Sequence, residues 1–362
     1  MAGGVAPQAL TRGRATNVVP AASLYAIDIG GTWLRSATWS KECGTNNVQH
    51  FRTPSLTNFP LADPGTLIDA LAERIASVPP KGDGLRVGIS LGAALDHRTG
   101  TIYGSAPLWG SALNGVPLLR LIQEKRPDVH WTIVNDVTAM LMAYHDRHPE
   151  LRAQKVLLTT VSTGIAARTL DVGTGAVPLD GAGLQGEIGH LPASAEGDLH
   201  LMCACGVLDH IAAYSSGPGI RNVASAFLGE LAPNDTTAPA LSSASRESNF
   251  EAAFAAALSG GESRATEVLR IATRPIADAF TSALTLDPTI DQIVLTGGVI
   301  DSIGPAYRAA LLKRMISNGM YYTAIHRPGW VTDRIVLATS DETSALLGAA
   351  LAANRASDEL ES

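Results

Sequence analysis

The stretch Tyr25–Arg35 reads YAIDIGGTWLR, and apolar runs on both sides of its two glycines predict a β-hairpin over Leu24–Trp39. Glycine adopts backbone angles that are closed to other residues, so the turn can present N–H groups to an anion. Thr32 adds a hydroxyl donor, and Asp28 ends the first strand, where a carboxylate can hold a metal-bound water. The residues alone fit either an ordinary hairpin or a turn that binds a Mg–nucleotide.

The chain has 362 residues, of which 46% are hydrophobic and 17% charged, an ordinary soluble composition that is long enough for two domains. A net charge of -7 speaks against a nucleic-acid-binding surface. No stretch approaches the roughly 18 apolar residues that a membrane span needs. Three cysteines, two of them one residue apart, do not make a disulfide framework. We therefore expect a cytoplasmic protein without nucleic-acid or membrane partners, preceded by a disordered tail over residues 1–23.

A second hairpin is predicted from Val156–Val161 and Ile165–Leu170, and each hairpin is followed by alternating helices and strands. This alternation indicates an α/β fold, and the duplication suggests two similar lobes facing a cleft. Further strands are predicted at Val48–Arg52, Leu85–Leu91, Trp131–Val134, Gln292–Leu295 and Ile335–Ala338. Helices are predicted at Thr66–Ala76, Val116–Gln123, Val137–His145, Leu208–Ala213, Glu251–Leu258, Ala265–Leu284, Ala306–Ile316 and Ser344–Ala353, and a loop at residues 232–247.

Four turns occur in a fixed order, and two further motifs lie between the last two of them. The turns are Asp28–Thr32, Asn135-Asp136, Ser162–Ile165 and Leu295–Gly298, and the motifs are Gly186–His190 and Cys203–Gly206. From about Leu24 to Ala353 this ordered set closely resembles the ROK family of sugar kinases and related repressors, in the actin/hexokinase superfamily. The resemblance implies two actin-like, ribonuclease-H-like lobes around a central cleft. It implies a small N-terminal lobe over 24–150, completed by a helix at 341–355, and a large lobe over 151–340. It also implies a homodimer.

The resemblance implies that ATP and Mg²⁺ are bound between two phosphate loops. The residues of these loops are Gly30, Gly31 and Thr32 in the first and Ser162, Thr163 and Gly164 in the second. Backbone amides of glycine and hydroxyls of threonine suit a polyphosphate. Gly297 and Gly298 match the turn that packs against adenosine, and Asp28 matches the carboxylate that handles the Mg–nucleotide.

Asp136 matches the catalytic base of the family, which accepts the proton of the attacking hydroxyl as it meets the γ-phosphate. A structural alternative is that Asp136 caps the helix expected from Val137. Asn135, Glu187 and His190 match residues that bind the hydroxyls of a small polyol substrate.

Family members often bind zinc through one histidine and three cysteines. Cys203 and Cys205 match that pattern, and His210 stands in place of the last cysteine. A structural zinc site of His190, Cys203, Cys205 and His210 is chemically sound, because imidazole is a good zinc ligand. His200 or Asp209 could replace one of these ligands, and a metal-free loop is the alternative.

Two departures from the family pattern bear on the substrate. Ala212 replaces a usual glutamate, and Leu108 and Trp109 stand where an asparagine usually contacts the sugar, with only Asn114 nearby. Fewer polar partners favour a substrate with fewer or displaced hydroxyls. The resemblance therefore implies a C7-cyclitol of the valiolone type or an amino sugar such as kanosamine, phosphorylated on its exocyclic primary hydroxyl in a bacterial antibiotic pathway.

Two alternatives to this substrate class stay open. The first is a glucokinase or other hexose kinase. The second is a sugar-responsive transcriptional regulator lacking its DNA-binding domain, since the residues before Leu24 are too few for a winged helix.

Overall fold

The predicted first hairpin is confirmed, and it forms the centre of a five-stranded sheet in the order β3-β2-β1-β4-β7. A computed structural model describes residues 24–82, 84–110, 115–170, 177, 186–194, 197–229 and 250–361, so the expectations for residues 1–23, 232–247 and Asn114 lie outside the described residues. The strands are β1 (Leu24–Ile29), β2 (Trp33–Ser40), β3 (Gly44–Arg52), β4 (Leu85–Leu91) and β7 (Val129–Asn135). β1 runs antiparallel to β2 and parallel to β4, which in turn runs parallel to β7.

One face of this sheet forms the core of the first lobe. Tyr25, Ile27 and Ile29 alternate along β1 and pack with apolar residues of the helices α1 (Pro64–Ser77) and α2 (Leu118–Lys125). α1 begins two residues earlier than predicted, because the carboxylate of Asp63 accepts a hydrogen bond from the Thr66 N–H at 3.0 Å and caps the helix. A short hairpin of β5 (Ala94–Asp96) and β6 (Thr101–Gly104) was not predicted.

The second lobe is built on a four-stranded sheet in the order β11-β10-β8-β9. Its strands are β8 (Lys155–Val161), β9 (Ile165–Thr169), β10 (Ile290–Thr296) and β11 (Ile335–Leu337), so the second predicted hairpin is confirmed as well. Its helices are α4 (Ile211–Ser215), α5 (Gly217–Gly229), α7 (Phe250–Ser259), α8 (Ser263–Leu286), α9 (Gly298–Asn318) and α10 (Thr323–His326). Several of these helices cover one face of the sheet with a large apolar core.

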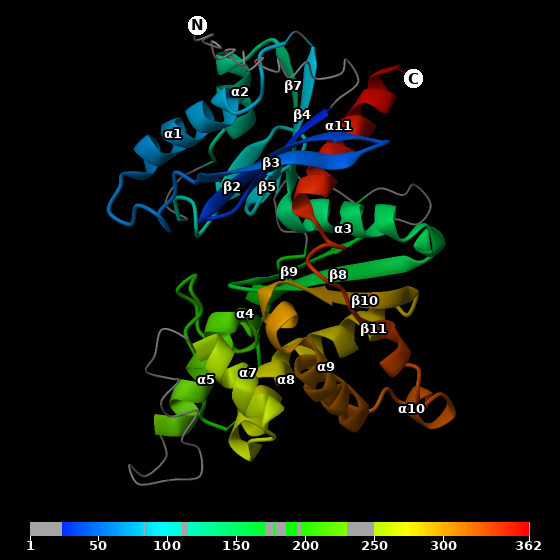
Figure 1. Ribbon diagram of the computed structural model, residues 1–362. Coiled ribbons are helices and arrows are strands. Elements are labelled where there is room, and N and C mark those ends of the chain that lie inside the picture. The colour runs from blue at the N-terminus through cyan, green and yellow to red at the C-terminus, as the bar shows by residue number, and fades with distance from the viewer. Residues whose placement is uncertain are drawn as a thin grey trace, which may run out of the picture.

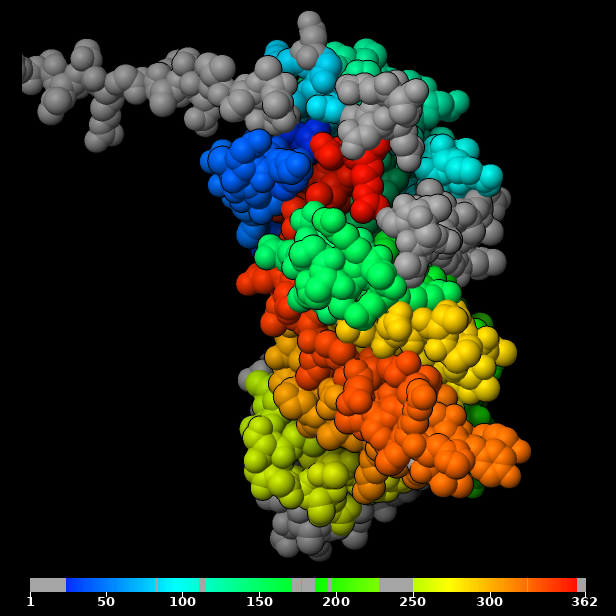
Figure 2. All heavy atoms as spheres, turned by 90° about the vertical axis from the view of Figure 1, so that its right-hand side faces the viewer, coloured from blue at the N-terminus to red at the C-terminus, as the bar shows by residue number. Residues whose placement is uncertain are grey.

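α3 (Asp136–Arg147) and α11 (Ala345–Glu361) join the two lobes. α3 lies between the two sheets in Figure 1. A separate apolar cluster packs Val137 and Leu141 of α3 against Leu158 of β8, and it includes Ala345 and Ala352 of α11. Figure 2 shows red α11 lying against the green segment that contains α3. The end of the chain therefore returns to the first lobe, while the predicted boundaries at residues 150 and 340 stay a prediction.

Two segments of the chain connect the lobes, and the side chain of one histidine holds these segments together. His148 follows α3, and Glu342 lies between β11 and α11. The His148 Nε2 lies 3.2 Å from the Glu342 carboxylate, and its Nδ1 lies 3.0 Å from Glu150. These contacts tie the two segments together on the edge of the lobe interface.

Two helices begin three or more residues away from their predicted starts. α4 begins at Ile211 rather than Leu208, because Leu208 and His210 form bridges with Met202 and Pro192 in the preceding loop. α9 begins at Gly298 rather than Ala306, with non-helical backbone angles at Ile303 just before Pro305. α8 runs through Pro275 as one helix. Among the described residues, no helix is both long and apolar enough to cross a membrane.

Candidate active site

Asp136 is the first residue of α3, at the junction of the two lobes. The structure corrects the alternative that Asp136 caps this helix, because the cap is Asn135. The Asn135 Oδ1 accepts hydrogen bonds from the N–H groups of Val137 at 2.9 Å and Thr138 at 3.3 Å. Its Nδ2 donates to the Ala93 carbonyl at 3.0 Å. Asn135 is 3% exposed, so most of its hydrogen-bonding capacity serves to place Asp136.

The Asp136 carboxylate lies in a site that disfavours its charge. Burial raises the pKa of Asp136 to about 6, and the negative charges of Asp28 and Glu187 add to the rise. A hydrogen bond from the Val137 N–H and the positive charge of Arg168 act in the opposite direction. A side chain with a pKa just below neutral is mostly ionised at pH 7 and can accept a proton, as a general base must.

Asp28 lies on β1, which β4 separates from β7, and it is held by two donors. Ser90 on β4 donates to the Asp28 Oδ1 at 2.8 Å, and the Arg35 Nε donates to Oδ2 at 3.0 Å. Asp28 is 5% exposed. An ionised carboxylate has about four lone-pair sites, so these bonds leave capacity for a metal-bound water.

The turn Gly30–Thr32 is braced from behind by the segment that follows β3. Thr53, Ser55 and Asn58 donate hydrogen bonds to the carbonyl oxygens of Gly30, Gly31 and Thr32 respectively. A Cβ on Gly31 would lie 2.6 Å from the Cβ of Pro107, so only glycine fits there. The carbonyl oxygens, which would repel a phosphate, are thus engaged elsewhere.

The turn at Ser162–Gly164 and the turn at Gly297-Gly298, predicted to bind phosphate and adenosine, lie side by side. Ser162 and Gly164 close the turn between β8 and β9, with the Ser162 N–H donating to the Gly164 carbonyl at 2.9 Å. Gly297 has φ +102°, and a Cβ on it would lie 2.7 Å from the Val161 carbonyl oxygen. Gly298 begins α9, so the short first part of this helix, before the kink at Ile303, starts beside this turn. A helix N-terminus favours anions.

Glu187 and His190 lie on the segment beside β9. The Ala167 N–H donates to the Gly186 carbonyl at 2.7 Å, which fixes this segment to the strand edge. The Glu187 carboxylate is partly exposed and lies 3.6 Å from the buried Arg168. His190 is exposed at the end of the short 3-10 helix Ile188–His190. The structure thereby brings Asp28, Asp136 and Glu187 near one another.

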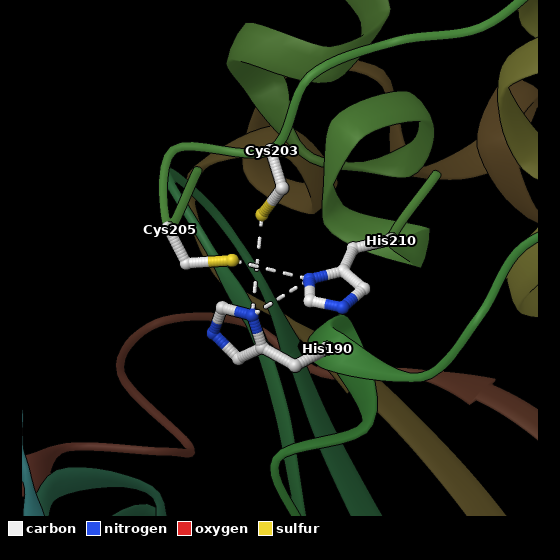
Figure 3. Close-up of side chains that lie close together, drawn as sticks. All are labelled: His190, Cys203, Cys205 and His210. Carbon is white, nitrogen blue, oxygen red and sulfur yellow. Dashed lines mark hydrogen bonds between the residues drawn. The ribbon is translucent and has the colours of Figure 1, made fainter. Parts of the chain in front are cut away.

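Figure 3 shows two histidines and two cysteines converging on one point. One ligand atom from each of His190, Cys203, Cys205 and His210 lies within 4.8 Å of the others. The Nδ1 atoms of His190 and His210 are 3.3 Å apart, the Cys205 Sγ is 3.2 Å from His210, and the Cys203 Sγ is 3.9 Å from His190. Tetrahedral Zn–N and Zn–S bonds place their ligand atoms about 3.3–3.8 Å apart. The donor set and its spacing therefore fit zinc.

The two alternative ligands have other partners. Asp209 is in the left-handed region with φ +57°. Its carboxylate lies 2.7 Å from the His200 Nδ1, accepts the Leu201 N–H at 3.1 Å and accepts the hydroxyl of Tyr214. Asp209 and His200 thus brace the loop that carries the cysteines.

The two apolar residues that stand in place of the family's sugar-contacting asparagine lie in the core. Leu108 and Trp109 are each 1% exposed and pack inside the first lobe, so their side chains do not line the site. The absence of that asparagine still removes a polar partner of the substrate. No apolar side chain takes its place in the site. Ala212 lies on α4 and is partly exposed.

Three residues of the site were not predicted from the sequence. A Cβ on Gly92 would lie 3.1 Å from the Asp136 Oδ2, so this glycine gives the carboxylate its space. Arg35 pairs with Asp28, and Arg168 pairs with Glu187. Arg35 could have been found from register, because a hairpin with a two-residue turn places it opposite Asp28.

Comparison with known proteins identifies the class. A profile of the ROK family matches residues 24–356, and the chain belongs to this family. The chain is 44% identical over 334 residues to a 2-epi-5-epi-valiolone 7-kinase from an Actinoplanes species, covering 90% of this chain and 91% of that protein. It is 27% identical to a C(7)-cyclitol 7-kinase from Streptomyces hygroscopicus subsp. jinggangensis, covering 82% and 85% of the two chains.

A solved structure supports the fold. The ROK family glucokinase from Streptomyces griseus, in complex with glucose and AMPPNP, superposes with a TM-score of 0.67 at 18% identity and covers 92% of this chain and 99% of that one. The predicted two-lobed fold of the ROK sugar kinases is confirmed.

The raised pKa of Asp136 predicts an effect on stability. The native state binds the Asp136 proton more tightly than the unfolded chain, so stability falls as the pH rises from about 4 towards 6 and stays lower at pH 7. Asp136→Asn removes this penalty, and we expect its melting temperature at pH 7 to rise by a few degrees, an effect of about 3 kcal/mol at most.

Asp28→Asn is the matched control, because it breaks the ion pair with Arg35 and should lower the melting temperature. Thermal unfolding of both variants and wild type at pH 4 and pH 7 measures the effect. A destabilised Asp136→Asn at pH 7 would contradict this account of the carboxylate.

Proposed function

We propose that this protein is an ATP-dependent kinase that phosphorylates the exocyclic primary hydroxyl of a C7-cyclitol, giving the 7-phosphate. The observation that carries the proposal is the 44% identity over 90% of the chain with the Actinoplanes 2-epi-5-epi-valiolone 7-kinase. We further propose, from the family resemblance, a cytoplasmic homodimer in a bacterial secondary-metabolite pathway.

Asp136 serves as the general base of this reaction. Its carboxylate takes the proton of the substrate's primary hydroxyl while that oxygen forms a bond to the γ-phosphorus. The bond between the γ-phosphorus and the bridging oxygen breaks, and ADP leaves. A pKa of about 6 leaves Asp136 ionised at neutral pH, yet basic enough to accept the proton.

The two glycine turns hold the polyphosphate. Gly31 and Thr32 contribute backbone N–H groups and the Thr32 hydroxyl from the first lobe, while the Gly30 N–H closes the turn on the Trp33 carbonyl. Thr163 and Gly164 contribute N–H groups from the second lobe, and Ser162 and Thr163 contribute hydroxyls. The start of α9 beside Gly297 and Gly298 adds backbone N–H groups that have no partner within the helix. Asp28 would hold a Mg²⁺-bound water, and the ion would neutralise charge on the transferred phosphate.

The hydroxyls of the cyclitol ring are bound by side chains around Asp136. Glu187 accepts hydrogen bonds from one or two hydroxyls. The Nδ1 of His190 faces the thiols, and its Nε2 points away from them and is available to a hydroxyl (Figure 3). Asn135 can offer its remaining amide hydrogen. Positioning of the primary hydroxyl in line with the γ-phosphate supplies much of the rate enhancement.

A substrate screen tests the proposed function. We expect wild-type protein with Mg–ATP to phosphorylate 2-epi-5-epi-valiolone or a related C7-cyclitol with a higher kcat/KM than glucose, mannose or kanosamine. Mass spectrometry detects the product, and NMR locates the phosphate on the exocyclic carbon. A clear preference for a hexose or for kanosamine would replace the cyclitol by that substrate. Sugar binding without consumption of ATP would favour a sensor.

We also propose that His190, Cys203, Cys205 and His210 bind a structural zinc ion. Their ring nitrogens and sulfurs converge on one point, which is the arrangement that a tetrahedral cation requires. Burial raises the pKa of the Cys203 thiol, and burial followed by the nearby His190 lowers the pKa of His210. A bound cation would favour the thiolate and the neutral imidazole that coordination requires. Zinc would lock the loop that presents His190 to the substrate.

Metal analysis checks this site. Protein purified without chelator should contain about one zinc per chain, and Cys205→Ser should lose most of it. Cys43→Ser is the matched control, because Cys43 is an exposed thiol on the first lobe and should leave the zinc content unchanged. Retention of full zinc by Cys205→Ser, or its absence from wild type, would contradict the site. Retention by His200→Asn is expected, since His200 pairs with Asp209.

A further inference from the structure

A fully buried arginine lies inside the proposed active site. Arg168 on β9 is 2% exposed, although arginine is almost never fully buried unless it is paired. Its strand position places it on the sheet face with Ala166 and Leu170, which packs against α3. Asp136 is the first residue of that helix. What the guanidinium contacts there therefore decides its role.

The guanidinium reaches the acidic residue of the neighbouring segment. The Arg168 Nη1 donates to the Ala167 carbonyl at 2.8 Å, and Nη2 lies 3.6 Å from the Glu187 Oε1. A Cβ on Gly186 would lie 2.6 Å from the Arg168 Nη1 and 1.5 Å from the Ala167 oxygen. Gly186 also has φ +71°. The glycine before Glu187 thus leaves the space through which Arg168 meets the carboxylate.

The charges around Asp136 make this cation important. Asp28 on β1 and Glu187 beside β9 both disfavour ionisation of Asp136, whereas Arg168 favours it. Arg35 on β2 is bound to Asp28. Three carboxylates and two arginines therefore share one site, and Arg168 is the arginine placed to act on both Glu187 and Asp136.

We propose that Arg168 is a positioning residue of the phosphoryl transfer, holding Glu187 toward the substrate hydroxyls and offsetting the negative charge around the base. The inference rests on the proposed function for its kinetic readout. Arg168 does not touch the reacting atoms in this role. Its planar fork can bond a backbone carbonyl and pair with a carboxylate at once, which a lysine cannot reproduce.

Arg168→Met and Arg168→Lys separate the two effects. Both variants should raise the KM for the polyol that wild type phosphorylates, by about tenfold or more, because Glu187 loses its anchor. Arg168→Met should also move the acid limb of kcat/KM to higher pH, because Asp136 loses a favourable charge. Arg168→Lys should keep that limb near its wild-type position. An unchanged KM and an unchanged acid limb in Arg168→Met would overturn the proposal.

Arg308→Met is the matched control for removing a guanidinium. Arg308 on α9 donates to the carbonyls of Ile335 at 2.6 Å and Thr332 at 2.8 Å, away from the three site carboxylates. We expect this variant to lose some thermal stability and to keep the wild-type acid limb. The same shift of the acid limb in Arg308→Met and Arg168→Met would show that the shift reports lost stability, and would overturn the assignment.

A second measurement follows the protonation of Asp136 directly and needs no turnover. Carbon NMR of the Asp136 carboxyl, assigned through Asp136→Asn, gives its titration midpoint in substrate-free protein. Glu187→Gln removes a negative neighbour and should lower the midpoint, and adding Arg168→Met to it should raise the midpoint again. If wild type phosphorylates no polyol, the proposed function fails while this titration still tests Arg168. A midpoint that is the same in Glu187→Gln and in Glu187→Gln with Arg168→Met contradicts the proposal, even where Arg168→Met alone folds poorly.

Discussion

The side-chain amide of Asn135 fixes the start of α3, and the rest of the site depends on that position. One oxygen accepts two helix N–H groups, and the nitrogen of the same amide holds the Ala93 carbonyl on the loop after β4. The cap therefore joins the helix that carries Asp136 to the strand that carries Ser90, the partner of Asp28. α3 in turn packs between the two sheets, so a helix terminus in the middle of the molecule sets the geometry of both lobes around the carboxylate.

The three carboxylates of the site differ in how far nearby cations offset their negative charge, and this difference suits the reaction. Asp28 has a direct guanidinium partner and Glu187 a looser one, whereas Asp136 is flanked by glycine and by other carboxylates. The residue with the least compensation is the one with the raised pKa. A polyphosphate with its metal would bring more charge to the same place, so the arginines and helix N-termini around the acids are as important as the acids. The thiol and imidazole cluster lies outside this balance and serves the loop that presents His190.

Much of this arrangement could be predicted from local patterns, and the remainder depends on contacts between distant residues. Gly30-Gly31, Ser162–Gly164 and Gly297-Gly298 each need only a strand and a turn, which a few neighbouring residues encode. The cluster of two histidines and two cysteines was implied by the family resemblance, although the choice among His210, His200 and Asp209 needed the fold of the loop. Leu108 and Trp109 were misread because a single sequence does not show whether an apolar residue faces the core or the substrate. Arg168 was missed because its role depends on tertiary contacts among β9, α3 and Gly186, which a single sequence does not show.

The central claim is that Asp136 removes the proton from the hydroxyl that is phosphorylated. Turnover and substrate affinity of Asp136→Asn, measured on the same folded protein, test it most directly. The account predicts that turnover falls by about 10²–10⁴-fold, as for loss of a general base, while calorimetry finds the polyol bound nearly as tightly as by wild type. Turnover near the wild-type rate, with the same product, would contradict it.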